Sequence, residues 1–312
     1  MQHTANKISV VIPLYNKRDS ITRAILSALS QEPAPREIIV VDDGSTDGSG
    51  DVVESLAAEH PSIRLIRQPN GGVSAARNRA MEVASGEYVA LLDGDDMWLA
   101  GYMAEICRLI TTYPDCGAYA TGFYVVDGSQ RVVGDTPGLE GVVDLFAESQ
   151  RHYVLIPSAT TLNRALALRL GGFPEGMRMG EDQYLWTKIA RNAKVCISPT
   201  PLIEYSRSGE NRSAAIYRPE QSLYSLEELY DPTATDLSNE YLARVALGKA
   251  LVQSVKGGTA EARRAAEFFS YTRLHRRALR KVRLLNALPG GWRATALNIY
   301  NRLAWLIARK GL

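Results

Sequence analysis

The sequence predicts an α/β fold: a mostly parallel sheet with flanking helices, extended at the C-terminus by further helices. Over about the first 110 residues, β-branched runs alternate with amphipathic helical stretches, which is typical of βαβ units. The runs are continuously apolar, as expected of strands buried on both faces. From about residue 216 the apolar spacing is helical to the end, with breaks at Gly257-Gly258 and Pro289-Gly290-Gly291.

In chain order, the first part predicts four strands, each followed by a helix. The strands are expected at 8–13, 37–41, 63–66 and 87–92, and the helices at about 20–29, 48–59, 73–84 and 97–112. Right-handed crossovers place these helices on both faces of the sheet. Ligands of such sheets bind at the carboxyl ends of the strands, so the residues that follow each strand are the first candidates for function.

The next segment is mixed in character. Strands are expected at 118–126, 131–133, 195–198 and 202–205, and a helix at 181–192. We therefore expect one large domain over residues 1–215 and a helical C-terminal region over residues 216–312.

The net charge of +2 hides an asymmetry along the chain. Residues 257–312 contain twelve Lys or Arg and two Asp or Glu, whereas the rest contains 24 basic and 32 acidic residues. The acidic body argues against a nucleic-acid ligand, which needs a basic footprint.

Cys107, Cys116 and Cys196 have the spacing of neither a zinc site nor a disulfide framework. The N-terminus does not resemble a signal peptide, and no apolar run reaches about 18 residues, so we expect a cytoplasmic protein without a transmembrane span.

Polar and acidic clusters follow three of the predicted strands. They are Pro13-Leu14-Tyr15-Asn16, Asp42-Asp43-Gly44-Ser45-Thr46-Asp47 and Asp93-Gly94-Asp95-Asp96. Carboxylates gathered at one rim repel each other unless a cation or hydrogen-bond donors hold them, and oxygen-only ligands favour Mg²⁺ or Mn²⁺. Either acidic cluster alone could be a turn or a helix cap. Both together at the ends of buried strands favour a binding site.

Two helix starts carry further candidates. Gly71 and Gly72 permit close approach of a ligand, and the helix that follows offers N–H groups to an anion. Arg77 in that helix could reach a phosphate or form a structural ion pair. Glu181-Asp182 opens a later helix, where a carboxylate could act as a general base or cap the first turn.

Taken in order, these motifs resemble those of family 2 glycosyltransferases of GT-A fold. The matching segments are Val11–Asn16, Val41–Asp47, Asn70-Gly71-Gly72 with Ala76-Arg77-Asn78, Leu92–Asp96 and Gly180-Glu181-Asp182, and the resemblance covers roughly Ile8 to Tyr205. It implies a nucleotide-sugar-binding half at about 1–96 and an acceptor half at about 97–215. It also implies an inverting, metal-dependent transferase of the hexosyltransferase type, with UDP the commonest donor nucleotide and a hydroxyl group as acceptor.

The resemblance also implies roles for single residues. Pro13, Tyr15 and Asp42 or Asp43 resemble the nucleobase pocket, and Asn16, Gly72, Arg77 and Glu181 further residues of the donor site. Asp93 and Asp95 match the Asp-X-Asp pair of the family, in which Asp95 would bind Mg²⁺ or Mn²⁺ at the diphosphate and Asp93 would support the ribose or the metal. Asp182 matches the catalytic base.

The sequence departs from the family after the last predicted strand. Many relatives carry a His and a Ser there, whereas the segment from Tyr205 to Ser213 contains no His. Arg207 or Arg212 could meet the diphosphate instead, as part of a lid, or the segment could be an exposed loop.

The basic C-terminal region combines charge with large apolar side chains. Basic residues from Arg263 to Arg283 are expected on one helix, and a second helix carries Trp292 and Trp305. Such helices suit an anionic membrane surface, or they cap the core with a solvated basic face. In the first case the protein would sit peripherally on the inner face of the cell membrane. Its acceptor would then be a glycan or lipid-linked, as in surface polysaccharide or lipopolysaccharide assembly.

Other functions stay open. A sugar nucleotidyltransferase would need a Gly-rich basic loop where Leu14-Tyr15-Asn16-Lys17 stands, and a phosphoacceptor domain would leave Asp182 unexplained. A dehydrogenase is disfavoured because no Gly-X-Gly-X-X-Gly follows the first strand. A non-catalytic nucleotide-sugar-binding domain is disfavoured by the complete acidic set.

Overall fold

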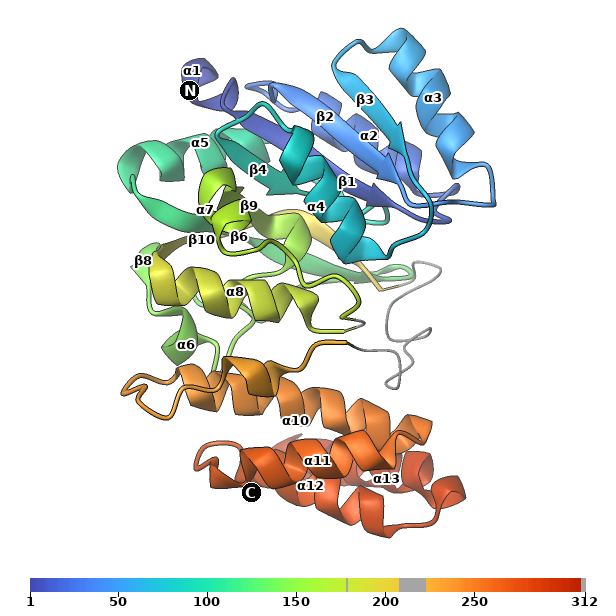
Figure 1. The fold of residues 1–312 in the computed structure, drawn as a ribbon, viewed down its shortest axis with the longest axis vertical. Helices are drawn as coiled ribbons and strands as arrows, with labels where there is room; N and C mark the ends of the chain where they lie inside the picture. Colours follow the sequence, from blue (N-terminus) through green and yellow to red (C-terminus); the bar gives the residue numbers. More distant parts are fainter. Residues whose placement is uncertain (178, 208–222, 310–312) are drawn as a thin grey trace. The chain divides into compact units, whose positions relative to one another are not determined.

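The computed structural model describes residues 1–177, 179–207 and 223–309, with side chains as far as residue 299. The chain divides into two compact units, Met1–Met177 with Glu181–Ile216, and Arg178–Gly180 with Tyr217–Leu312. The first unit contains the sheet, and the second contains the C-terminal helices (Figure 1).

The first unit is built on one curled sheet with the strand order β3-β2-β1-β4-β9-β6-β10-β5. Its strands are β1 (Ile8–Leu14), β2 (Glu37–Asp42), β3 (Ile63–Arg67), β4 (Tyr88–Leu91), β5 (Met97–Trp98), β6 (Cys116–Asp127), β9 (Thr160–Asn163) and β10 (Lys194–Ser206). Two short strands, β7 (Gln130–Val133) and β8 (Gly141–Val143), pair with β6 and β10. Because β3, β2, β1 and β4 are parallel, their carboxyl ends share one edge of the sheet.

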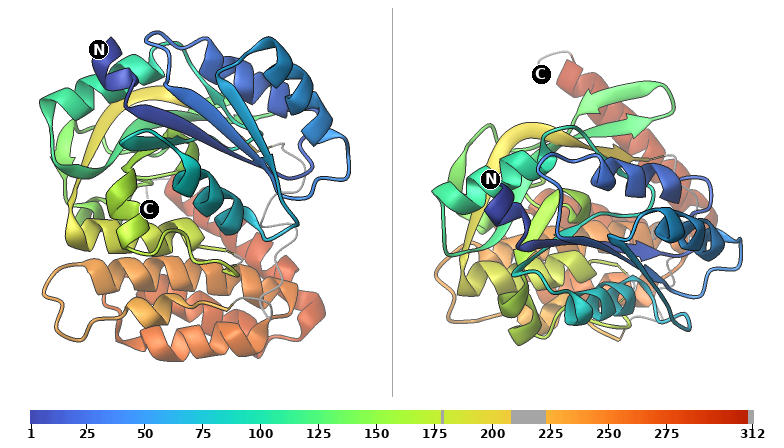
Figure 2. Two further views of the ribbon diagram at one scale, coloured as in Figure 1. Left: turned by 45° about the horizontal axis from the view of Figure 1, so that its top comes forward. Right: turned by 90° about the horizontal axis from the view of Figure 1, so that it is seen from above.

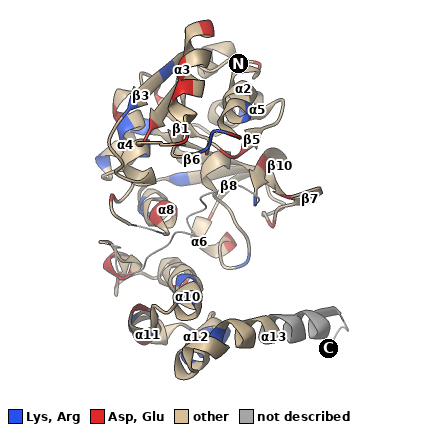
Figure 3. Cartoon of the chain, turned by 90° about the vertical axis from the view of Figure 1, so that its right-hand side faces the viewer, with Lys and Arg blue, Asp and Glu red and all other residues tan. Residues whose placement is uncertain are grey.

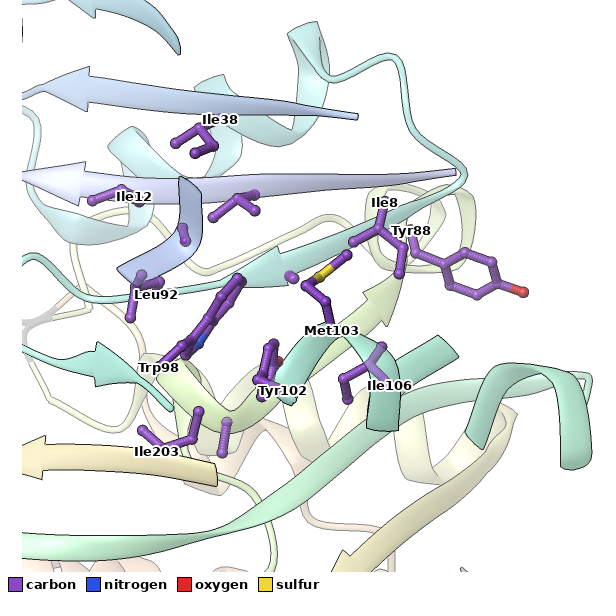
Figure 4. Close-up of a cluster of buried hydrophobic side chains, with 14 of the residues drawn as sticks. Ile8, Ile12, Ile38, Tyr88, Leu92, Trp98, Tyr102, Met103, Ile106 and Ile203 are labelled. Atoms are coloured by element: carbon purple, nitrogen blue, oxygen red, sulfur yellow. The ribbon is translucent and has the colours of Figure 1, made fainter. Parts of the chain in front are cut away.

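Helices cover both faces of this sheet. They are α1 (Gln2–Ala5), α2 (Ile21–Leu29), α3 (Ser49–Glu59), α4 (Val73–Val83), α5 (Tyr102–Thr112), α6 (Leu145–Glu148), α7 (Arg164–Arg169) and α8 (Glu181–Asn192), with a 3-10 turn η1 (Pro157–Ala159). Side chains alternate across β1, so that Val10 joins a core with α2 and α5, while Val11 joins a second core with α4 and α8. Figure 4 shows the first of these cores, in which Trp98 and Tyr102 stack at 4.1 Å between ring centroids. The predicted fold class is confirmed.

Two predictions for the first unit are wrong in detail. The helix expected from Met97 begins at Tyr102, because Met97 and Trp98 pair with β10 and Gly101 turns the chain at φ 94°. The two strands expected at 195–198 and 202–205 form the single strand β10, which curves along its length (Figure 2) and shifts register beside Pro201. Both differences come from pairing between strands distant in sequence, which local periodicity does not record.

The second unit is helical. It contains η3 (Leu226–Leu229), α10 (Ser238–Lys256), α11 (Thr259–Phe268), η4 (Phe269–Tyr271), α12 (Arg276–Ala287) and α13 (Gly290–Arg309). The single helix expected from Arg263 to Arg283 is wrong, because the chain turns between α11 and α12. The Glu240 carboxylate holds this turn by accepting hydrogen bonds from the backbone N–H groups of Arg273 (2.8 Å) and Leu274 (3.3 Å).

Within the described part of the chain, no helix combines the length and apolar character that crossing a bilayer requires.

Candidate functional site

The turns after β1 and β2 are tied together by Asn16. This residue has φ 51°, a left-handed conformation that Asn tolerates better than most residues. Its backbone N–H donates to Ser45 Oγ (3.0 Å), and its Oδ1 accepts from the backbone N–H of Thr46 (2.8 Å). Beside it, Pro13 is half-buried and the Tyr15 ring is 39% exposed. The edge of the sheet therefore presents an aromatic face to solvent on a fixed turn.

Asp43 is buried and organises the turn that precedes α4. Its Oδ1 accepts hydrogen bonds from Gln68 Nε2 and from the Gly71 N–H, both at 2.8 Å, and its Oδ2 accepts from the Gly72 N–H at 2.7 Å. Gly72 has φ 90°, which favours glycine. The N–H groups of the two glycines that precede α4 are therefore already bound by the Asp43 carboxylate.

Asp42 lies at the edge of a cavity of about 330 Å³ beside these turns. The cavity is lined by Asp42, Gly44, Ser45, Thr46, Gly48, Gly50, Asp51, Arg67 and Gln68. Asp42 is 6% exposed, and its Oδ1 accepts from the Ser45 N–H at 2.9 Å. Apart from Asp42, none of the described predicted site residues lines this cavity, so it does not by itself define the site.

Arg77 brings two of the predicted carboxylates together. Its guanidinium is buried, with Nη2 2.8 Å from Asp93 Oδ1 and Nη1 3.3 Å from Glu181 Oε1. The Phe173 ring lies against it, 5.1 Å from the guanidinium carbon to the ring centroid. Asp93 follows β4 and Glu181 opens α8, so Arg77 joins elements that are distant in the sequence, and its own separation from Glu181 is 104 residues. The ion-pair alternative for Arg77 is therefore present in the structure.

Asp182 lies in the first turn of α8, beside this ion pair. It is half-buried, and its carboxylate accepts hydrogen bonds from the backbone N–H (2.9 Å) and Nε2 (3.0 Å) of Gln183. Burial, followed by the negative charge of Glu181, raises the pKa of Asp182 to about 7, although Arg77 opposes the shift. A carboxyl group with this pKa is suited to taking a proton near neutral pH. The acidic residues at the start of α8 are marked in Figure 3.

Asp95 is paired with a residue that the sequence did not single out. Lys17 Nζ lies 2.6 Å from Asp95 Oδ2, and both side chains are largely buried, at 13% and 16% exposed. Arg23 Nη2 also donates to the backbone carbonyl of Asp95 at 3.0 Å. Lys17 follows the turn after β1, so the same turn that presents Tyr15 also supplies a counter-ion to Asp95.

The carboxylates fit one part of a divalent metal site. Within the residues that the structure describes, no group of three or more His, Cys, Asp or Glu side chains is arranged to hold a metal ion. Mg²⁺ is commonly held by one or two carboxylates that are completed by substrate phosphates. Asp93 and Asp95 keep 26% and 16% of their side chains exposed. They therefore suit a metal ion held by two carboxylates and substrate phosphates, once the Lys17 ammonium group has moved away from Asp95.

Asp96, the last residue of the same cluster, has a structural role. It is buried, and its Oδ1 accepts from the backbone N–H of Ser206 at 2.8 Å while its Oδ2 accepts from Ser158 Oγ. The backbone N–H of Asp93 donates in turn to Ser158 Oγ at 3.0 Å. Ser158 thus positions Asp93, but it lies in a segment without any motif, and nothing local in the sequence marks it.

Of the two arginines proposed for a lid, the structure describes only Arg207. The backbone N–H of Arg207 donates to the carbonyl of Val126 at 2.7 Å, which continues the pairing of β10 with β6. The Arg207 side chain is exposed. Arg212 lies outside the described residues.

Comparison with known proteins shows to which family the chain is similar. The model of the family described as glycosyl transferase family 2 matches residues 9–186, more than half of the chain. These residues run from β1 into the first half of α8 and include every carboxylate of the candidate site.

Individual relatives match over shorter stretches. An uncharacterized glycosyltransferase of Escherichia coli strain K12, YibD, is 46% identical over 96 residues, which are 31% of this chain and 28% of that protein. A putative teichuronic acid biosynthesis glycosyltransferase of Bacillus subtilis strain 168, TuaG, is 42% identical over 92 residues, 29% of this chain and 36% of that protein. The chain thus spans about a third of the length of these curated relatives.

Solved structures share the fold over most of the chain. TarS residues 1–349 of S. aureus, in complex with UDP-GlcNAc, matches with a TM-score of 0.61 and 24% identity, covering 86% of this chain and 74% of that one. The mannosyltransferase PcManGT of Pyrobaculum calidifontis, in complex with GDP-Man and Mn²⁺, has a TM-score of 0.59 and 20% identity, with 92% and 87% covered. The GT-A fold prediction is confirmed. With the family match over residues 9–186, the chain belongs to glycosyl transferase family 2.

Proposed function

We propose that this chain transfers a sugar from a nucleotide-diphosphate donor, with UDP as its nucleotide, to an acceptor hydroxyl with inversion at the anomeric carbon. The observation that carries the proposal is the cluster around Arg77. It joins Asp93, on the donor side of the sheet edge, to Glu181, which is adjacent in sequence to Asp182. A transferase that inverts needs a donor site and one base close together, and this cluster supplies both.

Asp182 is the proposed general base. An acceptor hydroxyl is a poor nucleophile until its proton is removed. The Asp182 pKa of about 7 leaves a substantial fraction of this carboxyl group ionised at neutral pH, and the ionised form is basic enough to take a proton. Attack by the acceptor opposite the leaving group requires one base and no covalent intermediate, so no second carboxylate nucleophile is needed.

The edge of the sheet is the proposed donor site. The exposed Tyr15 ring and Pro13 would pack against the nucleobase, with Asp42 or Asp43 beside it. Asn16 and Gly72 hold the two turns that frame this site. UDP is supported by the UDP-GlcNAc complex of the structurally similar TarS.

Asp95 and Asp93 are the proposed ligands of Mg²⁺ or Mn²⁺, which when bound would act as a Lewis acid toward the leaving diphosphate. The Mn²⁺ complex of the Pyrobaculum mannosyltransferase supports this choice. Arg77 neutralises part of the charge of Asp93 and keeps it in place. Arg207 or Arg212 is proposed to meet the diphosphate from the segment after β10.

The acceptor is proposed to be a glycan or a lipid-linked glycan in surface polysaccharide or lipopolysaccharide assembly. The similarity to TuaG, a putative teichuronic acid biosynthesis glycosyltransferase of Bacillus subtilis, supports a cell-surface polymer. The basic helices from residue 257 support a peripheral contact with an anionic membrane.

A panel of nucleotide-sugars with Mn²⁺ or Mg²⁺, scored for release of the nucleoside diphosphate, tests the proposal. Asp182→Asn should lower the rate of transfer by about 10²–10⁴-fold and retain donor affinity, while Glu82→Gln, an exposed change on α4, should leave both unchanged. Normal transfer by Asp182→Asn would show that the base is another residue. With pyrophosphate added to the assay, release of a sugar 1-phosphate together with a nucleoside triphosphate, in place of a nucleoside diphosphate, would favour nucleotidyl transfer.

A further inference from the structure

We propose that the second unit contains a binding site for a polyol phosphate between α11 and α12. A cavity of about 270 Å³ lies there, lined by Arg263, Ala266 and Glu267 of α11 and by Arg283, Asn286 and Ala287 of α12. Its volume is near the lower end of the range for small-molecule sites. No residue of the cavity takes part in the proposed sugar transfer, so this site stands or falls independently of that function.

Asn286 gives the first indication of a ligand. Its side chain is 5% exposed, and neither Nδ2 nor Oδ1 has a hydrogen-bond partner in the part of the chain that the structure describes. Burial of an amide without partners is unfavourable, and such groups are rare in native proteins. The other buried side chains of α12 are Leu279, Val282 and Leu285, so the pattern predicts an apolar residue at 286. An amide retained at such a position is explained by a ligand that satisfies it.

The charges around the cavity define the chemistry of that ligand. Within the described residues, Arg263 and Arg283 form no ion pair, and Arg263 Nη2 donates to the backbone carbonyl of Asn286 at 3.4 Å. The other N–H groups of the two guanidinium groups are available to a phosphate, whose geometry they match. Asn286 offers one donor and one acceptor function, and a hydroxyl group satisfies both. The Glu267 carboxylate can accept a hydrogen bond from a second hydroxyl, whereas it would repel a bare phosphate. Together these groups fit a phosphate ester that carries free hydroxyls.

This chemistry has two sources. One is a free polyol phosphate such as sn-glycerol 3-phosphate, and the other is the glycerol phosphate headgroup of an anionic phospholipid. Both present a phosphate joined to a glycerol with free hydroxyls, as a monoester in the free metabolite and as a diester in the lipid. The experiment therefore uses a soluble probe and a vesicle probe.

The first arm titrates the full-length protein with sn-glycerol 3-phosphate, inorganic phosphate and glycerol by calorimetry. Saturable binding of sn-glycerol 3-phosphate is expected, at least tenfold tighter than binding of the other two. Asn286→Leu and Arg283→Gln should each weaken it at least tenfold. Arg277→Gln, on the same helix and outside the cavity, should leave it unchanged. Equal affinity in all three variants would overturn the proposal.

The second arm is flotation with vesicles of phosphatidylcholine alone or mixed with phosphatidylglycerol. Asn286→Leu keeps the net charge, so its loss of flotation with phosphatidylglycerol would identify the lipid headgroup. Loss of soluble binding alone would identify the free metabolite. If wild type and Asn286→Leu behave alike in both arms, the site does not bind this class of ligand.

Stability supplies a further check. If the Asn286 amide has no partner in the unliganded protein, Asn286→Leu should keep or raise the midpoint of thermal unfolding. A lower midpoint would show that the amide serves the fold and would count against the proposal. Should that variant fail to fold, Arg283→Gln and Glu267→Gln, both at exposed positions, decide the question by the same titration.

Discussion

At the scale of single residues, the chemistry of the proposed site depends on how much negative charge the protein holds near Asp182. Burial and the neighbouring Glu181 disfavour its ionised form, whereas Arg77 favours it. The balance leaves a base that titrates near neutrality. A base with an ordinary Asp pKa would be ionised more fully but would take a proton less readily.

This balance predicts a pH dependence of both activity and stability. Transfer should fall as the pH drops below about 7, because Asp182 becomes protonated. The pKa in the folded state lies above the unfolded value of 3.8, so the associated stabilisation is complete below about pH 4 and is lost as the pH rises through 7. Compared with Asp182→Asn, the wild type should therefore lose free energy of unfolding between pH 5 and 7, by at most about 1.4 kcal/mol per pH unit. Urea denaturation at several pH values measures this difference, and parallel curves for the two proteins would contradict it.

A second prediction concerns Lys17. Its ammonium group lies 2.6 Å from Asp95 Oδ2 in a largely buried position, so it competes with any metal ion for that oxygen. Lys17→Met should therefore raise the affinity for Mn²⁺ in the absence of nucleotide, by about tenfold if one close ion pair near the surface is removed. Titration followed by the electron paramagnetic resonance of free Mn²⁺ measures this affinity. Arg18→Met, an exposed neighbour, is the matched control, and an affinity unchanged by Lys17→Met would show that the two cations do not compete.

Motifs in the sequence locate most of the candidate site, but not the residues that hold it. The acidic clusters and Asp182 are visible because each follows a recognisable strand or opens a helix. Lys17 and Ser158 act through contacts 78 and 65 residues away in the chain. A lone Lys or Ser in a turn carries no such signal, so their roles require the folded geometry.

At the scale of elements, the start of α4 depends on the carboxylate of Asp43, which directly follows β2. The Asp43 carboxylate accepts from three donors, on Gln68, Gly71 and Gly72. Asp43→Asn would place an amide NH₂ against one of these donors and leave that donor without an acceptor. We expect a loss of about 1–3 kcal/mol in the free energy of unfolding. Asp51→Asn, which changes an exposed partner of Arg67, should cost less than about 1 kcal/mol. Chemical denaturation of both variants makes the comparison, and equal losses would mean that the Asp43 hydrogen bonds do not hold the turn.

The elements that the sequence predicts well are those with a strong local pattern. β1, β2, α3 and α8 form where apolar periodicity and helix-start signals coincide. β9 (Thr160–Asn163) is not predicted, because its four residues are too few to show a period along the sequence. It is nevertheless the antiparallel strand that connects β4 to β6 in the sheet, and its position is decided by long-range pairing.

At the scale of the whole molecule, charge divides between the two parts of the chain. Arg276, Arg277 and Arg280 are exposed on α12, and each basic residue near an anionic surface contributes about 1 kcal/mol to binding. Changing all three to Gln should therefore lower the partitioning onto phosphatidylglycerol vesicles by about a hundredfold. The same change at exposed Arg64, Arg79 and Arg169 of the first unit removes equal charge and should have little effect. Equal losses in the two triple variants would mean that net charge, and not α12, governs the contact.

The position of Arg77 between two carboxylates has one further consequence. Both of its terminal nitrogens are already engaged, by Asp93 and by Glu181. The Arg77 Nε has no hydrogen-bond partner within the described residues, so an incoming phosphate could accept from it while both ion pairs stay in place. The negative charge of that phosphate would offset part of the positive charge that Arg77 provides to Asp182. Binding of the donor would then raise the pKa of Asp182 further, so that this base would take a proton more readily once the donor is bound.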